Sequence, residues 1–171
     1  MSKKSLRTYD AHETERMQAL HGIPLASFKS RASAFIVDFL IVFGLFLGLL
    51  FAGAALARRL GYVFSENAVV PFDFKHWYSL LLIVVYFALA TYWGNGKTPG
   101  KWIFGIRVVS LGRERITLWQ SFERALGYGA SMLEAGFGFL QYFMNVNRRT
   151  VHDRIAETIV INDRIQKAPH Q

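Results

Sequence analysis

Two long stretches of the chain consist almost entirely of apolar residues. Phe39–Ala57 contains nineteen residues without a charge, and the apolar pattern begins about two turns earlier, with only Asp38 interrupting it. At 1.5 Å per helical residue, about 20 residues cross the hydrocarbon layer of a bilayer. Trp77–Trp93 contains seventeen uncharged residues with aromatic residues at both ends, where interfacial rings are expected. The pattern predicts transmembrane helices at about 32–57 and 77–93.

A third apolar block, Ala125–Val146, carries Glu134 near its middle and several glycines. It either spans the membrane or turns back as a re-entrant segment near Gly136–Gly138. Lys and Arg divide as twelve and eight between the two sides for a spanning helix, and as seventeen and three for a re-entrant one. The positive-inside rule favours the re-entrant form, whereas the length of the run (125–146) favours a continuous helix. Both alternatives place the N-terminus in the cytoplasm.

The stretch between the second and third blocks has strand character. Ile103–Val109 is short and β-rich, Leu111–Glu114 contains turn residues, and Arg115–Leu118 could return as a second strand. These residues predict a small β-hairpin at the cytoplasmic surface. Thr158–Ile161 is a further strand candidate, and it could join the hairpin only if both lie on the same side of the membrane.

The polar flanks set the expected domain bounds. Residues 1–23 are predicted to be a polar cytoplasmic tail, 24–162 the membrane domain, and 163–171 a second polar tail. No cleavable signal peptide is expected, because the first apolar run follows a long polar segment and lacks a cleavage motif before Arg58. The predicted fold is an α-helical integral membrane protein with two transmembrane helices, a third spanning or re-entrant segment and a small cytoplasmic β-hairpin. The predicted location is the inner (plasma) membrane, with several passes.

Composition excludes several classes of function. The chain has no Cys, which removes disulfide frameworks, zinc ribbons, thiol nucleophiles and iron–sulfur clusters. Its 20 basic and 12 acidic residues give a net charge of +8. The basic residues lie beside apolar segments rather than on one soluble face, so the charge predicts contact with a lipid bilayer and no nucleic acid.

No enzyme site is predicted. The five His residues have no helical metal-binding spacing, and no serine nucleophile motif is present. Gly94–Lys101 resembles a phosphate-binding loop, but Asn95 and Trp102 occupy positions that require Gly and Ser or Thr. We therefore expect no catalytic residue, metal or cofactor, and interpret the loop as a cytoplasmic turn whose basic residues face lipid head groups.

Asp38 is the residue most costly to place in the first predicted span. Arg31 precedes it by seven residues, so the two share a helix face. An ionisable side chain at that depth costs several kcal/mol unless it is paired or hydrated, which makes Asp38 a functional candidate. The alternative is that Asp38 accepts hydrogen bonds from a neighbouring helix or an Arg and only fixes helix packing. Glu134 is a weaker second candidate.

Small residues repeat at four-residue spacing on the first predicted span. Gly44, Gly48 and Ala52 form a small-xxx-small pattern that allows two helices to approach closely. The pattern predicts helix packing, either within the chain or in a homo-oligomer, and indicates no function.

Several motifs, in order, resemble the RDD family of small prokaryotic membrane proteins. The resemblance covers roughly 24–162 and is carried by Arg31 with Asp38, the loop residues Thr98, Gly100, Lys101 and Gly105, Val108, Arg124, and Thr150–Arg154 with Thr158. It implies that Arg31, Asp38 and Asp153 are the signature arginine and aspartates. It also implies a transport role, because some members are described as sodium/proton antiporters.

Three functions follow as hypotheses. In a transporter, Asp38 would exchange a proton for a small cation while nearby Arg31 favours its charged form, with Glu134 or Asp153 as a second site. Because two or three spans are few for a carrier, it would act as an oligomer. The alternative is a non-transporting assembly or regulatory protein that docks a partner through its cytoplasmic hairpin. An enzyme has the least support.

Overall fold

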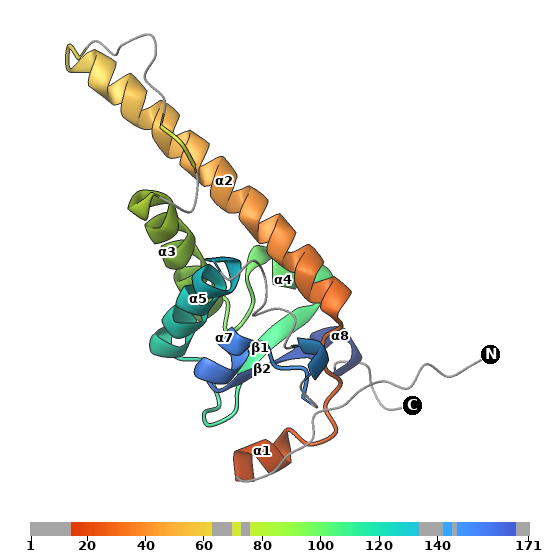
Figure 1. Cartoon of the computed structure of the whole chain (residues 1–171). Coiled ribbons are helices and arrows are strands. Elements are labelled where there is room, and N and C mark those ends of the chain that lie inside the picture. Colours follow the sequence, from red (N-terminus) through yellow and green to blue (C-terminus); the bar gives the residue numbers. More distant parts are fainter. Residues whose placement is uncertain (1–14, 63–69, 73–75, 134–141, 145–146, 167–171) are drawn as a thin grey trace.

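The computed structural model describes residues 15–62, 70–72, 76–133, 142–144 and 147–166. Figure 1 shows a long helix, α2, that runs out from a compact group of shorter helices and two strands. The elements, in chain order, are α1 (Glu15–Ala19), α2 (Phe28–Arg59), α3 (Trp77–Trp93), α4 (Pro99–Phe104), β1 (Ile106–Ser110), α5 (Leu118–Leu133), α7 (Val151–Ile155), β2 (Thr158–Asn162) and α8 (Asp163–Gln166).

The first two predicted helices are present. α2 contains the predicted segment 32–57, and α3 has the predicted bounds 77–93. Ser27 caps α2 by accepting a hydrogen bond from the Ser30 amide, 3.2 Å away. Within the described residues, α2 is the one helix both long and apolar enough to cross a membrane, and α3 is a shorter apolar helix. At 32 residues α2 is about 48 Å long, and its C-terminal half extends beyond the other labelled elements (Figure 1).

The third helix begins earlier than the apolar block predicted. α5 starts at Leu118 because Thr117 and Gln120 form a reciprocal cap. The Gln120 amide donates to Thr117 Oγ1 at 3.1 Å, and the Thr117 amide donates to Gln120 Oε1 at 3.2 Å. Glu134 and the predicted bend at Gly136–Gly138 lie outside the described residues.

The predicted β-hairpin is wrong, although both strands of the sheet were among the candidates. β1 pairs antiparallel with β2, with Val108 opposite Val160. Residues 115–118 form no strand: Ile116 packs into the core, and α5 begins at the end of this segment. The sheet therefore joins two segments that are distant in the sequence instead of two neighbours.

The described hydrophobic core is divided into separate clusters. α2, α3 and α5 pack around Val42, Phe87 and Ala125, while Ala34 of α2 packs against Ile106 and its neighbours in the sheet. On the opposite face of the sheet, Leu20 and Leu25 from the segment around and after α1 pack against Leu111, Ile159 and Ile161.

The described structure extends past the predicted domain bounds at both ends. Residues 15–23, expected to be part of a polar tail, contain α1 and the buried Leu20. At the other end α8 begins with Asp163, which pairs with Lys97 and Arg107. Both flanks therefore contribute contacts to the sheet region.

The beginning of α2 lies against the sheet. The Ala26 amide donates to the Val160 carbonyl at 2.9 Å, and the Asn162 amide donates to the Pro24 carbonyl at 2.8 Å. The start of α2, the segment that follows α3 and the end of the described chain therefore meet at one end of the molecule (Figure 1).

Candidate functional site

The loop between α3 and β1 is shaped by the motif that resembled a phosphate-binding loop. Thr98 is the N-cap of α4, and Pro99 occupies the first helical position, where its missing N–H costs nothing. Gly100 lies so close to α2 that a Cβ there would be 2.2 Å from the Ala34 carbonyl oxygen. Gly105 ends α4 in the left-handed region, with φ of 64°. The motif thus builds a short helix that fits tightly on α2.

Asp38 binds this loop. Its carboxylate is fully buried and accepts hydrogen bonds from the Gly100 amide at 2.8 Å, the Tyr86 hydroxyl at 3.1 Å and the Thr98 hydroxyl. One carboxylate therefore joins α2, α3 and α4. These donors satisfy the hydrogen-bonding capacity of a carboxyl group that would be costly to bury without partners.

Asp153 lies between two arginines. Arg31 Nη1 donates to Oδ2 of Asp153 at 2.7 Å, and Arg124 Nη1 donates to Oδ1. Both oxygens of this fully buried carboxylate are thus engaged, and the Thr150 amide adds a further donor at 3.2 Å. Arg31 therefore pairs with the distant Asp153, although the sequence places it on the same helix face as Asp38.

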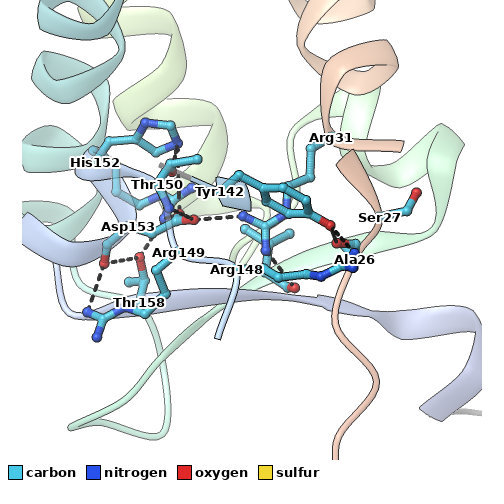
Figure 2. Close-up of polar contacts among 12 residues, drawn as sticks. Ala26, Ser27, Arg31, Tyr142, Arg148, Arg149, Thr150, His152, Asp153 and Thr158 are labelled. Atoms are coloured by element: carbon cyan, nitrogen blue, oxygen red, sulfur yellow. Dashed lines mark hydrogen bonds and ion pairs between the residues drawn. The ribbon is translucent and has the colours of Figure 1, made fainter. Parts of the chain in front are cut away.

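Backbone and hydroxyl groups complete this ion-pair cluster (Figure 2). Arg31 Nη2 donates to the Val160 carbonyl at 3.2 Å, and Arg124 also donates to Thr158 Oγ1. Burial raises the pKa of Asp153, but the charges of Arg124 and Arg31 lower it by more, so its pKa lies well below the ordinary value. The cluster is therefore charged and joins α2, α5, α7 and β2.

His152 is buried next to Asp153. Its Nε2 lies 2.8 Å from Thr150 Oγ1. Burial and the nearby cations lower the pKa of His152 to about 3, although Asp153 acts in the opposite direction. His152 is therefore neutral at physiological pH.

Tyr142 lies between two guanidinium groups. The guanidinium carbons of Arg31 and Arg148 are each 5.1 Å from its ring centroid. Its hydroxyl donates to the Ala26 carbonyl at 3.1 Å and accepts from Arg148 Nη1 at 2.6 Å, as Figure 2 shows. Tyr142 thereby holds the segment before α7 against the start of α2.

Lys101 is a buried cation of a different kind. Its side chain lies among aromatic rings, with Nζ 5.7 Å from the Phe87 ring centroid and 5.9 Å from that of Tyr128. Nζ donates to Thr98 Oγ1 at 3.3 Å. Within the described part of the chain, Lys101 has no ion pair with a carboxylate.

These side chains surround a cavity of about 340 Å³ between α2, α5 and the sheet. Among its described lining residues, the charged ones are the cations Arg31, Lys101 and Arg124; neither Asp38 nor Asp153 lines it. The rest of the described lining is apolar, aromatic or neutral: Phe28, Ala32, Phe35, Ile36, Ile106, Tyr128, Tyr142, Thr150, His152 and Val160. The cavity is therefore mainly apolar, with three cationic side chains among its described lining residues.

The structure divides the predicted site residues between two clusters. Asp38, Thr98 and Gly100 form the first, and Arg31 with Asp153 forms the second. Lys101 links the first to the cavity, Gly105 ends α4 as described, and Glu134 lies outside the described residues.

Gly44, Gly48 and Ala52 lie elsewhere, on the exposed part of α2. A Cβ at either glycine would meet nothing within 4 Å in the described structure. Their predicted role in close packing is therefore not fulfilled by described contacts within this chain.

Sequence reasoning missed the cavity and several residues around it. Arg124 was one of the residues that carry the family resemblance, but no role was predicted for it. Its position one helical turn before Tyr128 could have indicated the contact between the two side chains. Tyr142 and Tyr86 gave no signal, because aromatic residues in apolar segments are common.

Comparison with known proteins decides the family. A model of the RDD family matches residues 25–157. The chain belongs to the RDD family. This RDD protein is also 26% identical over 146 residues to the uncharacterized membrane protein YteJ of Bacillus subtilis (strain 168), an alignment that covers 83% of this chain and 84% of YteJ. No solved structure matches it significantly. The chain is thus an RDD-family membrane protein.

Proposed function

We propose that this RDD protein binds an anionic ligand in the cavity between α2, α5 and the sheet. The observation that carries the proposal is the charge of the described cavity lining, in which three residues are cationic and none is acidic. Lys101 matters most, because its buried ammonium lacks a described carboxylate partner and burying an unpaired charge is costly. An anion in the cavity would offset that cost.

The same geometry is unfavourable for cation/proton exchange, the function favoured by the sequence. Asp38 already accepts three hydrogen bonds, and Asp153 is held by two arginines. A cation would have to displace these donors to reach either carboxylate. If the protein transports a solute through this cavity, we therefore propose that the solute is an anion.

Thermal unfolding of the purified protein in detergent tests the binding proposal. Inorganic phosphate or phosphatidylglycerol should raise the midpoint above that in chloride at the same ionic strength. Lys101→Met should abolish this increase, whereas Lys29→Met, which removes an exposed charge outside the cavity, should retain it. The proposal is wrong if neither anion stabilises the wild-type protein.

Ion flux distinguishes the two kinds of transport. Proteoliposomes with an internal pH dye, challenged with sodium, potassium and lithium gradients, should show no cation-driven pH change. A cation-driven change that is lost in a folded Asp38→Asn variant would instead place Asp38 on a cation path. The alternative function, docking of a partner protein, would have to use the β1–β2 sheet and the exposed residues 112–115 as the binding surface. The hairpin that was predicted to bind the partner does not form.

The proposed topology has two crossings and a cytoplasmic N-terminus. It is supported by the pairing of β1 with β2, because the segment between these strands must begin and end on the same side. It is also supported by the contacts of residues 24–26 with β2, which bring the start of α2 to that side. In this arrangement the third apolar block is re-entrant, and the basic residues of the sheet side face the cytoplasm of the inner membrane.

A further inference from the structure

The walls of the cavity connect to the outer apolar surface of α2. Phe28, Ala32, Phe35 and Ile36 line the cavity from one face of this helix. Ile36 is also 58% exposed, so it lies where the cavity meets the outer surface. Leu40, one turn further along the same face, is 62% exposed. An exposed apolar strip therefore leads from the cavity toward the far end of α2.

Apolar side chains also lie on the other side of Phe28. Its ring contacts those of Tyr142 and Phe143, with centroids 5.4 and 5.0 Å apart. Phe143 is 63% exposed and Met144 80% exposed. Large exposed apolar groups beside the cavity indicate contact with another apolar partner.

We infer that the occupant of the cavity is an anionic phospholipid. Its phosphate would be held by Lys101, Arg31 and Arg124, and its acyl chain would lie along Ile36 and Leu40 on α2. This inference rests on the proposed anion binding and adds the class of ligand. Charge complementarity selects the head group, and the exposed apolar strip selects a ligand that carries a tail.

The position of the cavity agrees with this occupant. It lies near the first turns of α2, below the long apolar part of that helix, where the head-group layer of a bilayer would be. Basic pockets at this level, between helices, suit lipid phosphates. A small free anion would leave the exposed apolar surface of Ile36 and Leu40 uncovered.

A matched pair of probes tests the inference. The protein in dodecyl maltoside is titrated by calorimetry with dioctanoylphosphatidylglycerol and with glycerophosphoglycerol, the same head group without acyl chains. We expect the lipid to bind and the head group to bind at least about tenfold more weakly. Dioctanoylphosphatidylcholine, which has the same tails without net charge, should also bind about tenfold more weakly.

Variants separate the cavity from general attraction to the protein surface. Lys101→Met should weaken phosphatidylglycerol binding about tenfold, Lys101→Arg should restore much of it, and Lys29→Met should change it little. Ile36→Ser should weaken binding of the lipid without changing binding of glycerophosphoglycerol. If Lys101→Met does not fold, Lys101→Gln provides the same loss of charge.

The outcomes are distinguishable from those of the proposed function. If glycerophosphoglycerol binds as tightly as the lipid, the inference is overturned and anion binding stands. If neither probe nor phosphate binds, both are overturned. Phosphatidylglycerol binding that persists unchanged in Lys101→Met would reflect lipid around the helices and would also overturn the inference.

Discussion

Asp38 and Asp153 are both buried, but each holds a different part of the molecule together. Asp38 joins α2 to α3 and to the start of α4, and Asp153 joins α7 to α2 and α5. Arg31 belongs to the second group only. The two buried carboxylates therefore act as two clamps, because each joins three helices through its hydrogen bonds or ion pairs.

Replacing Asp153 by Asn tests the second clamp. The substitution leaves Arg31 and Arg124 buried without a counter-charge, so we expect the free energy of unfolding to fall by about 3–5 kcal/mol. Chemical unfolding in detergent measures the loss. Glu114→Gln, an exposed acidic residue, is the control and should change stability by less than about 1 kcal/mol. An equally small effect for Asp153→Asn would contradict a clamp.

His152 should make stability depend on pH. Its pKa is about 3 in the folded chain against 6.5 ordinarily, so below pH 6.5 the unfolded chain binds a proton that the folded chain does not. Stability should therefore fall as pH drops from 6.5, by up to about 1.4 kcal/mol per unit. The lowered pKa of Asp153 acts at lower pH, because its contribution is lost only below the ordinary value of 3.8.

Unfolding midpoints measured between pH 6.5 and 3.8 check this dependence. His152→Asn should flatten the curve in that window. A slope that survives in His152→Asn would assign the proton uptake to other groups.

At the scale of elements, the fit of α4 on α2 depends on Gly100. A methyl group there would meet backbone of α2, which cannot move away as a flexible side chain can. We expect Gly100→Ala to cost at least about 1–3 kcal/mol and to loosen the Gly100–Asp38 hydrogen bond. Gly48→Ala, where a methyl group has open space, is the matched control and should not destabilise the protein. Similar unfolding midpoints for the two variants would exclude tight packing at Gly100.

Elements set by local sequence were predictable, and those set by distant partners were not. The apolar runs located α2 and α3, because burial in lipid or in a core depends on residues within one helix. The hairpin prediction was wrong because the turn residues after β1 suggested a neighbouring partner strand. β1 instead pairs with β2, which follows α5 and α7 in the sequence. The start of α5 could have been predicted from Thr117 and Gln120, which have the spacing of a helix cap. The prediction instead followed the apolar block, which begins later.

The candidate site shows the same division. Asp38 and Arg31 stood out because charges in apolar segments are costly, and the loop motif stood out by its Gly and Pro. The partner of Arg31 lies 122 residues away, so no local spacing indicates it. The positive charge of the cavity lining comes from three cations on α2, α4 and α5. These residues are distant in the sequence, and only folding brings them together.

At the scale of the whole molecule, the sheet joins three parts of the chain at one end. Residues 24–26 and β1 are each hydrogen-bonded to β2, and α2 extends away from them. If α2 crosses the bilayer, its far end and the sheet lie on opposite sides. Gln18, Arg113 and Arg154 are exposed near the sheet, and Tyr62 is exposed beyond the end of α2.

Cysteine labelling tests this arrangement directly, because the natural chain has no Cys. Single Cys residues at positions 18, 113 and 154 should all be protected from an impermeant thiol reagent added to intact cells, and all should react after lysis. A Cys at position 62 should react from outside. Labelling of position 154 but not position 18 from outside would require an odd number of crossings between these positions and would contradict the proposed topology. Uniform protection of all four positions would instead show that α2 does not cross the membrane, since its two ends would then lie in the same compartment.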